Sequence, residues 1–407
     1  MESSKQDFIP ILVGGDINTY SMARTFHEAY GIKSVVVGRM PLPIIRLSSI
    51  IEEIIIDEDL LNTKSFVDAL KKVAKKFEHR KAKLLLVGTN DFYVRLIIEN
   101  SIALRDFFTF NYINEELMNN LLVKANFYRL CTKYPYIDIP KTYFFSCKDA
   151  SCVIPDITYP AIVKPSDGIQ HLKNPFEGQK KVYKVNNKNE LTKVISDIKG
   201  SGYLEDLIIQ DYIPGDDTAM WDSVFYCDHT GKAQLISFAQ VVLQEHTPTA
   251  IGNYTALISR FNEEMMMKLK KFLEELGYVG FANFDIKYDS RDNKFKVFEV
   301  NIRQGRSSFY VTACGHNLAK YLVDDIIYNI KHELTLVREH ILFSVVPMAV
   351  IKTAVTNKDI QREAIRLLND GHFVNPLYYK KDTGWKRSLY LFLRSINYIV
   401  KYKRHTW

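Results

Sequence analysis

Two polar stripes in adjoining segments, residues 281–288 and 295–303, constrain this chain more than any other feature. In both segments polar and apolar side chains alternate with the two-residue period of a β-strand. The polar positions are Asn283, Asp285 and Lys287 in the first segment, and Glu299, Asn301 and Arg303 in the second. A short polar turn separates the segments, so the pattern predicts a β-hairpin whose polar side chains share one face.

The predicted hairpin sets two carboxylates against each other. With a three-residue loop, Arg291 to Asn293, the symmetric register places Asp285 directly opposite Glu299. Facing carboxylates repel, which destabilises the hairpin unless a cation lies between them. Mg²⁺ prefers carboxylate and amide oxygens together with phosphate oxygens, so the pattern favours a magnesium site. The alternative is a solvated hairpin face with scattered charge.

The Glu-x-Asn-x-Arg sequence that begins at Glu299 strengthens the magnesium interpretation. It resembles the motif with which ATP-grasp ligases bind two Mg²⁺ ions on their last two core strands. The resemblance implies that Asp285, Glu299 and Asn301 are metal ligands, with ATP and Mg²⁺ as cofactors and Mn²⁺ as a substitute ion. It also implies an ATP-grasp fold of the α/β class, α+β overall. Such a fold has an N-terminal Rossmann-like domain, a small lid subdomain and a C-terminal catalytic domain.

Other segments resemble the family in the order that it requires. Lys124 stands where the family has a phosphate-contacting lysine at a helix start, and Lys164 lies in a strand whose lysine reaches the α-phosphate. Residues 207–217 resemble the hinge whose backbone pairs with adenine. In that segment the resemblance assigns nucleotide binding to Gln210, Asp211 and Ile213, and ribose binding to Asp217.

Each of these nucleotide-binding residues also has an ordinary structural explanation. A lysine at a helix start or in a strand is usually solvated, and Pro-Gly-Asp-Asp at 214–217 is common turn chemistry. The chain also departs from relatives that carry a glycine-rich phosphate loop, because only Gly168 and Gly178 occur between residues 166 and 181. Lys173, Lys180 and Lys181 either cover the phosphates when a lid closes or are simply solvated.

Arg303, Gly305 and Arg306 continue the segment of the metal motif. A planar guanidinium binds a carboxylate or a phosphate through two parallel hydrogen bonds, so an arginine here can stabilise an acyl phosphate and the oxyanion that follows. The resemblance adds a backbone amide at Gly305, four residues after Asn301. The alternative for both arginines is a solvated surface side chain.

The first hundred residues predict a doubly wound parallel sheet. Apolar runs at 8–13, 34–37, 54–56 and 84–87 are typical of buried strands, and amphipathic stretches up to Tyr30 and over 65–77 are typical of helices. The ligand of such a sheet binds beyond the carboxyl ends of its strands, here near 14–18 and 88–93.

Length and the family resemblance together predict four parts. A chain of 407 residues exceeds what one hydrophobic core usually holds. We expect a Rossmann-like domain at 1–112, a small lid subdomain at 113–204, a large catalytic subdomain at 205–340 and a C-terminal extension with a basic aromatic tail at 341–407.

Cysteine usage and hydropathy indicate a cytoplasmic protein. The five cysteines are odd in number and lack C-x-x-C spacing, which favours reduced thiols: Cys131, Cys147, Cys152, Cys227 and Cys314. Residues 1–10 contain no apolar signal core, and the longest nearly apolar run, 341–351, is too short to span a bilayer.

The chemistry implied by the family is amide-bond formation through a phosphorylated carboxylate. Over nearly its whole length the chain is similar to the D-aspartate ligases of Gram-positive bacteria, most clearly at 8–24, 247–254, 280–285 and 301–309. That family joins the β-carboxyl of D-aspartate to the ε-amino group of the stem-peptide lysine in a nucleotide- or lipid-linked peptidoglycan precursor. No residue visibly selects the D-isomer. The base for the amine is also unassigned, with Asp222, Glu245 and His246 in a region whose position the sequence does not fix.

Three alternatives remain. The first is another ATP-grasp ligase with a different carboxylate donor. The second is a nucleic-acid-binding protein, suggested by the net charge of +7, although no zinc-finger or RRM signature accompanies the charge and we expect no nucleic acid partner. The third concerns the basic, aromatic tail at 385–407, which either contacts the inner face of an anionic membrane or packs as a terminal helix on its domain.

Overall fold

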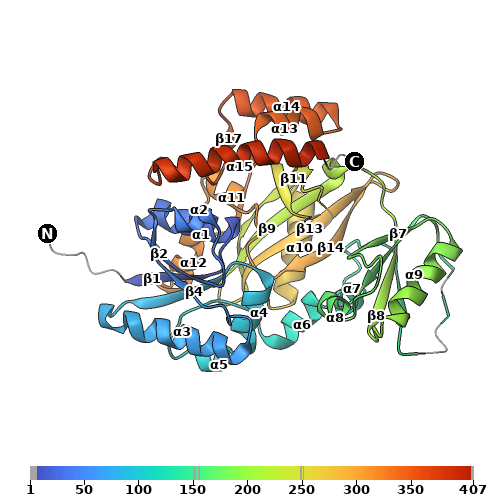
Figure 1. Ribbon diagram of the computed structural model, residues 1–407, viewed down its shortest axis with the longest axis horizontal. Helices are drawn as coiled ribbons and strands as arrows, with labels where there is room; N and C mark the ends of the chain where they lie inside the picture. The colour runs from blue at the N-terminus through green and yellow to red at the C-terminus, as the bar shows by residue number, and fades with distance from the viewer. Residues whose placement is uncertain (1–6, 150–152, 155, 248–249, 251, 405–407) are drawn as a thin grey trace. The chain divides into compact units, whose positions relative to one another are not determined.

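The computed structural model describes residues 7–149, 153–154, 156–247, 250 and 252–404. Contacts within the chain divide it into two units (Figure 1). The large unit comprises residues 1–115, 216–283 and 301–407, and the small unit comprises 116–215 and 284–300. The predicted four-part division remains a prediction. Cys152 and parts of the predicted 247–254 motif and of the tail lie outside the described residues.

The large unit begins with a parallel sheet in the order β3-β2-β1-β4. Its strands are β1 (Phe8–Val13), β2 (Ser34–Gly38), β3 (Ile51–Ile56) and β4 (Lys83–Gly88). The helices between and after them are α1 (Ile17–Tyr30), α2 (Pro43–Arg46), α3 (Thr63–Phe77), η1 (Glu78–Arg80), α4 (Asp91–Glu99) and α5 (Ser101–Leu104). Leu12 of β1 belongs to one apolar cluster with residues of α1, and its neighbour Ile11 belongs to another with residues of α3. Because successive strand residues point to opposite faces, both faces of the sheet are covered. The predicted doubly wound parallel sheet is confirmed.

Local chemistry explains where these helices begin. The Asp16 carboxylate accepts hydrogen bonds from the backbone amides of Asn18 and Thr19 and thereby caps α1. Asn90 caps α4 in the same way. Between β1 and α1 the chain passes so close to β4 that a Cβ on Gly14 would lie 1.9 Å from Thr89 Oγ1. Only glycine fits at that position.

A second sheet fills the rest of the large unit. Its path runs β9 (Met220–Cys227), β11 (Phe238–Gln244), β12 (Tyr254–Arg260), β16 (Leu342–Ser344) and β17 (Phe373–Val374), with β10 (Ala233–Ile236) on β9 and β15 (Thr335–Leu336) on β10. The helices are η2 (Asp217–Ala219), α10 (Glu263–Glu275), α11 (Phe309–Ala313), α12 (Leu318–Ile326), α13 (Met348–Ala354), α14 (Lys358–Asn369) and α15 (Trp385–Arg404). Side chains of α1, β12 and α15 belong to one buried apolar cluster, so both ends of the chain share a core.

The small unit contains an antiparallel sheet in the order β5-β8-β6-β7. Its strands are β5 (Thr142–Ser146), β6 (Ala161–Pro165), β7 (Tyr183–Val185) and β8 (Asp206–Asp211), and its helices are α6 (Glu115–Leu122), α7 (Lys124–Cys131), α8 (Gly168–Lys173) and α9 (Lys188–Gly200). The predicted strand with Lys164 is β6, and the predicted helix start at Lys124 is the first residue of α7.

The predicted hairpin is formed by β13 (Gly280–Asp289) and β14 (Lys294–Asn301). Residues 284–300 of it belong to the small unit. Four residues, 290–293, connect the strands rather than the predicted three, and Asn293 takes the left-handed conformation with φ 57°. No helix among the described residues is long and apolar enough to cross a membrane.

Candidate active site

The two predicted carboxylates are in contact in the small unit. Asp285 on β13 and Glu299 on β14 share a side-chain hydrogen bond. In the large unit, Asn301 Nδ2 donates to the Asn283 carbonyl oxygen at 3.3 Å. Both contacts agree with the predicted register. A hydrogen bond between two carboxyl groups requires a shared proton, and a metal cation in its place relieves the same repulsion.

Lysines surround this carboxylate pair. Lys124 Nζ lies 3.5 Å from Glu299 Oε2. Burial alone would raise the pKa of Glu299, but the Lys124 charge, the Asp285 hydrogen bond and the charges of Lys181 and Lys164 together lower that pKa to about 2. Glu299 is therefore an anion at neutral pH, as a metal ligand must be.

The same cluster disfavours the charged form of Lys164, whereas it favours the charged form of Glu299. Its ammonium group lies 4.8 Å from the ring centre of Phe298. Burial, and then repulsion by Lys124, lowers the pKa of Lys164 to about 8, and Lys181 and Lys287 lower it further against the attraction of Glu299. Cations that repel one another in this way favour an anionic ligand such as a phosphate. This surrounding is not that of a simply solvated lysine.

The residues 166–181, which lack the glycine-rich loop, include the short helix α8. Lys173, Lys180 and Lys181 are exposed there. The charge of Lys181 reaches both Glu299 and Lys164, whereas the backbone oxygen of Lys180 accepts from His171 Nε2 at 3.0 Å. The phosphate-covering role predicted for the three lysines remains a prediction.

The predicted adenine hinge begins in the middle strand of the small sheet. Gln210 is paired with Thr142 on one side and with Ile162 on the other. Its buried side chain donates from Nε2 to Thr142 Oγ1 at 2.9 Å. Asp211 ends β8, and its Oδ1 is buried without a hydrogen bond from any residue that the structure describes. Ile213 is buried just beyond the strand, so the roles predicted for these residues remain predictions.

Asp217, predicted to bind ribose, is engaged within the large unit. Its Oδ1 accepts from Gln244 Nε2 at 2.7 Å, and its Oδ2 accepts from the Gln244 amide at 3.1 Å. His246 Nε2 lies 2.9 Å from the same Oδ2. A ribose hydroxyl would have to share these oxygens with Gln244 and His246, and the ribose-binding role of Asp217 remains a prediction.

Arg303 is held in a defined orientation. Its Nη2 donates to Asp91 Oδ2 at 2.9 Å and its Nη1 to the Gln304 carbonyl oxygen at 3.1 Å, while the side chain is 16% exposed. Gly305 lies so close to β13 that a Cβ there would be 2.6 Å from Asn283 Oδ1. Arg306 is half-buried. The catalytic roles predicted for Arg303, Gly305 and Arg306 remain predictions.

The loops predicted to bind a ligand meet the Arg303 segment in the large unit. Asn18 Nδ2 donates to the Thr89 carbonyl oxygen at 2.7 Å and to the Gln304 carbonyl oxygen at 3.1 Å. Gln304 Nε2 donates to the Gly88 carbonyl oxygen at 3.4 Å. The carboxyl ends of β1 and β4 therefore lie beside residues 303–305, where an open α/β sheet binds its ligand.

Asp222 is one of the three residues considered as the base for the amine, and the sequence did not fix its place in the fold. It is fully buried on β9, and its Oδ1 accepts from Asn283 Nδ2 at 2.6 Å. Burial raises the pKa of Asp222 to about 6, against hydrogen bonds from Asn283 and Tyr310 and the charge of Arg303. The signal in the sequence was a lone carboxylate inside the apolar run of β9. The other two residues left without a position are paired elsewhere, Glu245 with Lys401 at 2.6 Å and His246 with Asp217.

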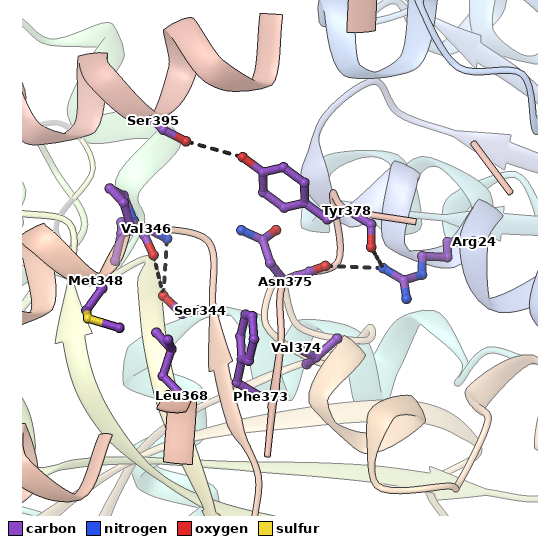
Figure 2. Close-up of a pocket in the computed structure, with 11 residues that line it drawn as sticks. Arg24, Ser344, Val346, Met348, Leu368, Phe373, Val374, Asn375, Tyr378 and Ser395 are labelled. Atoms are coloured by element: carbon purple, nitrogen blue, oxygen red, sulfur yellow. Dashed lines mark hydrogen bonds between the residues drawn. The ribbon is translucent and has the colours of Figure 1, made fainter. Parts of the chain in front are cut away.

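A cavity of about 530 Å³ lies elsewhere in the large unit (Figure 2). Arg24 reaches it, but Arg24 Nη1 already donates to the carbonyl oxygens of Asn375, Pro376 and Tyr378 at 2.7–3.2 Å. None of the predicted site residues lines this cavity. It therefore adds nothing to the candidate site.

The predicted ligands suit magnesium better than a metal that needs several protein ligands. Among the described residues no group of three or more His, Cys, Asp and Glu side chains can hold a metal ion. Asp285 and Glu299 offer two carboxylates, and Asn301 follows Glu299 by two residues on β14. Mg²⁺ commonly takes one or two carboxylates and completes its shell with water and phosphate oxygens, so these donors suit it.

A curated relative resembles the chain over nearly its full length. The D-aspartate ligase of Enterococcus faecium (strain Aus0004) is 32% identical over 415 residues, which cover 98% of this chain and 97% of the relative. No family model matches the chain.

Solved structures share the fold at low sequence identity. An L-amino acid ligase from Bacillus licheniformis is 13% identical with a TM-score of 0.55, over 79% of this chain and 75% of that one. The biotin carboxylase domain of Hydrogenobacter thermophilus 2-oxoglutarate carboxylase, in complex with MgADP, ADP and bicarbonate, is 15% identical with a TM-score of 0.58, over 79% and 70% of the two chains.

Proposed function

This chain belongs to the D-aspartate ligase family, and from that premise we propose that it joins the β-carboxyl of D-aspartate to the ε-amino group of the stem-peptide lysine in a peptidoglycan precursor. The chain is an enzyme that forms a C–N bond, and its fold is the predicted ATP-grasp fold. The acceptor lysine and the β-carboxyl donor are the proposed parts. ATP and Mg²⁺ are the cofactors, and ADP and phosphate the products.

The observation that carries the proposal is the lysine-ringed carboxylate pair of the small unit. Asp285 and Glu299 are in contact, and Lys124 and Lys164 stand close to Glu299. Two carboxylates suit a magnesium ion, and the lysines suit the phosphates that accompany it. Lys124, Lys181 and Lys287 repel Lys164, and phosphate oxygens would offset that repulsion.

Each part of the chain has a task in the proposed reaction. A carboxylate is a poor acyl donor, so it must be phosphorylated before an amine can displace phosphate. Bound Mg²⁺ supplies neutralisation of the negative charge on the phosphoryl group. Lys124 and Lys164 hold phosphate oxygens as point charges. Arg303, fixed by Asp91, offers a planar donor for the acyl phosphate and the developing oxyanion.

The location that suits this reaction is the cytoplasm, where ATP and the lipid- or nucleotide-linked precursor are found together. The described cysteines Cys131, Cys227 and Cys314 are buried and form no disulfide, which suits a reducing compartment.

Phosphate release measured with ATP and Mg²⁺ across D- and L-amino acids, with and without the precursor, tests the proposal. We expect release with D-aspartate, an increase when the lysine-containing precursor is added, and an amide product at its ε-amino group. Equal rates with L-aspartate would refute the donor assignment. Turnover with another carboxylate alone would identify the chain as a different amino-acid ligase.

A further inference from the structure

Helix α15 is attached to the large unit by one face. That face buries Arg387, Leu391, Tyr398 and Tyr402 against neighbours that include α2 and α13 (Figure 1). The Arg387 guanidinium donates to the carbonyl oxygens of Ile44 at 2.7 Å and Leu377 at 3.1 Å. The predicted packing of the tail on its own domain is present in the structure, and it leaves one face of the helix exposed.

The C-terminal end of α15 contacts Gln244, the last residue of strand β11, and Glu245, which follows it. Tyr402 Oη donates to the Gln244 carbonyl oxygen at 2.6 Å, and Lys401 Nζ pairs with buried Glu245 at 2.6 Å. Deleting α15 would remove these contacts and uncover the core. A test of the other face therefore requires substitutions on the helix surface.

The opposite face of α15 is apolar and exposed. Its side chains are Trp385, Leu389, Phe392, Leu393, Ile396 and Val400, and they define what we call the outer face. Trp385 is 74% exposed and Phe392 is 61% exposed. Spacings of three, four and seven residues place these positions on one stripe along the helix. Large apolar side chains gathered along one stripe mark an interaction site, because single exposed residues are normal but contiguous ones are rare.

Exposed cations lie at both ends of the outer face. Lys386 lies at the start of α15, and Lys403 and Arg404 lie at its end, all three exposed. Lys380 and Lys381, also exposed, precede the helix. The helix contains no acidic residue, and the nearby Asp382 is buried and paired with Arg387 at 3.2 Å. An apolar stripe bordered by cations complements a surface that is apolar beneath and anionic on top.

We propose that the outer face of α15 lies in the headgroup region of an anionic lipid bilayer, parallel to its surface. A 20-residue helix is about 30 Å long, and the outer face supplies an aromatic and aliphatic stripe along that length. The helix does not qualify as a membrane span, so it lies on the bilayer. The cations at both ends contact lipid phosphates, and the apolar side chains reach the acyl boundary.

The test measures binding of the full chain to vesicles of phosphatidylglycerol and phosphatidylcholine and to vesicles of phosphatidylcholine alone. The main variant combines Leu389→Gln, Phe392→Gln and Ile396→Gln, because glutamine keeps helix propensity while removing apolar surface. The matched control combines Ile102→Gln, Val153→Gln and Leu204→Gln, three exposed apolar residues outside α15. Far-ultraviolet circular dichroism and thermal unfolding confirm that both variants fold.

We expect the wild type and the control to bind the anionic vesicles and the outer-face variant to bind them at least about tenfold more weakly. A Lys386→Glu and Lys403→Glu variant should also bind about tenfold more weakly, and added salt should weaken wild-type binding. Equal binding by the outer-face variant and the wild type would overturn the proposal. Absence of vesicle binding, or a wild-type dimer in light scattering that the outer-face variant abolishes, would also overturn it. A dimer would instead assign the outer face to a second copy of the chain.

Discussion

The two units shift the pKa of an acid group in opposite directions. In the small unit, cations surround Glu299 and lower its pKa to about 2 against the effect of burial. In the large unit, burial dominates at Asp222 and raises its pKa to about 6. One carboxylate is thus kept charged for a ligand, whereas the other gains a proton easily and hydrogen-bonds Asn283. The comparison shows that burial sets the pKa of a carboxylate where cations are few, and that a cluster of cations overrides burial.

The largest expected effect comes from removing the negative charge of Glu299. Glu299→Gln keeps the shape but removes the charge, so we expect ATP-dependent phosphate release to fall by more than about 10³-fold. Thermal unfolding should show a folded protein. Glu275→Gln, at an exposed helix position with no predicted role, is the control and should retain full activity. Activity within tenfold of wild type in Glu299→Gln would remove Glu299 from the metal site.

A smaller loss is expected when one cation of the lysine ring is removed. Lys164→Met retains the apolar stem over Phe298 but not the charge, and we expect about a 10²-fold loss of kcat/KM for ATP. Calorimetry should show weaker MgATP binding. The substitution also removes the repulsion between Lys164 and its neighbouring lysines. A variant that binds MgATP as tightly as wild type would contradict a phosphate-binding role for Lys164. Lys199→Met on α9 is a control outside the ring.

Gly305 tests the contact between the Arg303 segment and Asn283. In Gly305→Ala the new Cβ would lie 2.6 Å from Asn283 Oδ1, so the segment must shift. We expect about a tenfold loss of activity and a loss of about 1–3 kcal/mol in the free energy of unfolding, as in other overpacked sites. Gly200→Ala is the control, because a Cβ there meets no atom within 4 Å. An active and fully stable Gly305→Ala enzyme would show that residues 303–306 are not held against β13.

The last expected effect is a pH dependence of stability at Asp222, with no predicted loss of activity. Its pKa in the folded state, about 6, lies above the ordinary value of 3.8, so the folded state binds more protons than the unfolded state between those values. The contribution of Asp222 to the free energy of unfolding therefore falls as pH rises through this window, by at most about 3 kcal/mol. Asp222→Asn keeps the acceptor for Asn283 and should abolish that fall.

Urea unfolding measured from about pH 4 to pH 7 provides the check. Exposed Asp68→Asn is the control and should leave the wild-type pH profile unchanged. The same slope in Asp222→Asn as in wild type would show that Asp222 is not the group responsible. Glu299 should contribute with the opposite sign, because its folded pKa lies below the ordinary value, and its stabilisation is lost as pH falls toward 2.

Short-range patterns made part of this structure predictable. The strand Phe8–Val13 follows from its apolar run, whereas the helix start at Lys124 was implied by the family resemblance. The contact of Asp285 with Glu299 follows from strand alternation across a short turn. The predicted length of that turn, three residues, was one residue too short. These features depend on residues close together in the sequence, where period and turn chemistry fix geometry.

The remaining features depend on long-range packing. Arg303 pairs with Asp91, which lies 212 positions earlier, and Asn283 meets Asp222 across 61 positions. No periodicity encodes such pairs, because they arise only when whole sheets pack. The two-sided character of α15 was also hidden, because large apolar or aromatic side chains occur on both its buried and its exposed face.

The Asn18 amide ties together three stretches of chain. One side chain satisfies the carbonyl oxygens of Thr89 and Gln304, which lie 71 and 286 positions away. The conformation of residues 303–306 therefore depends on the turn between β1 and α1, which holds Asn18 in place. A chimera that imports residues 301–309 from a relative should bring that relative's own residues 14–18 with it, or the transplanted loop will lose its anchor.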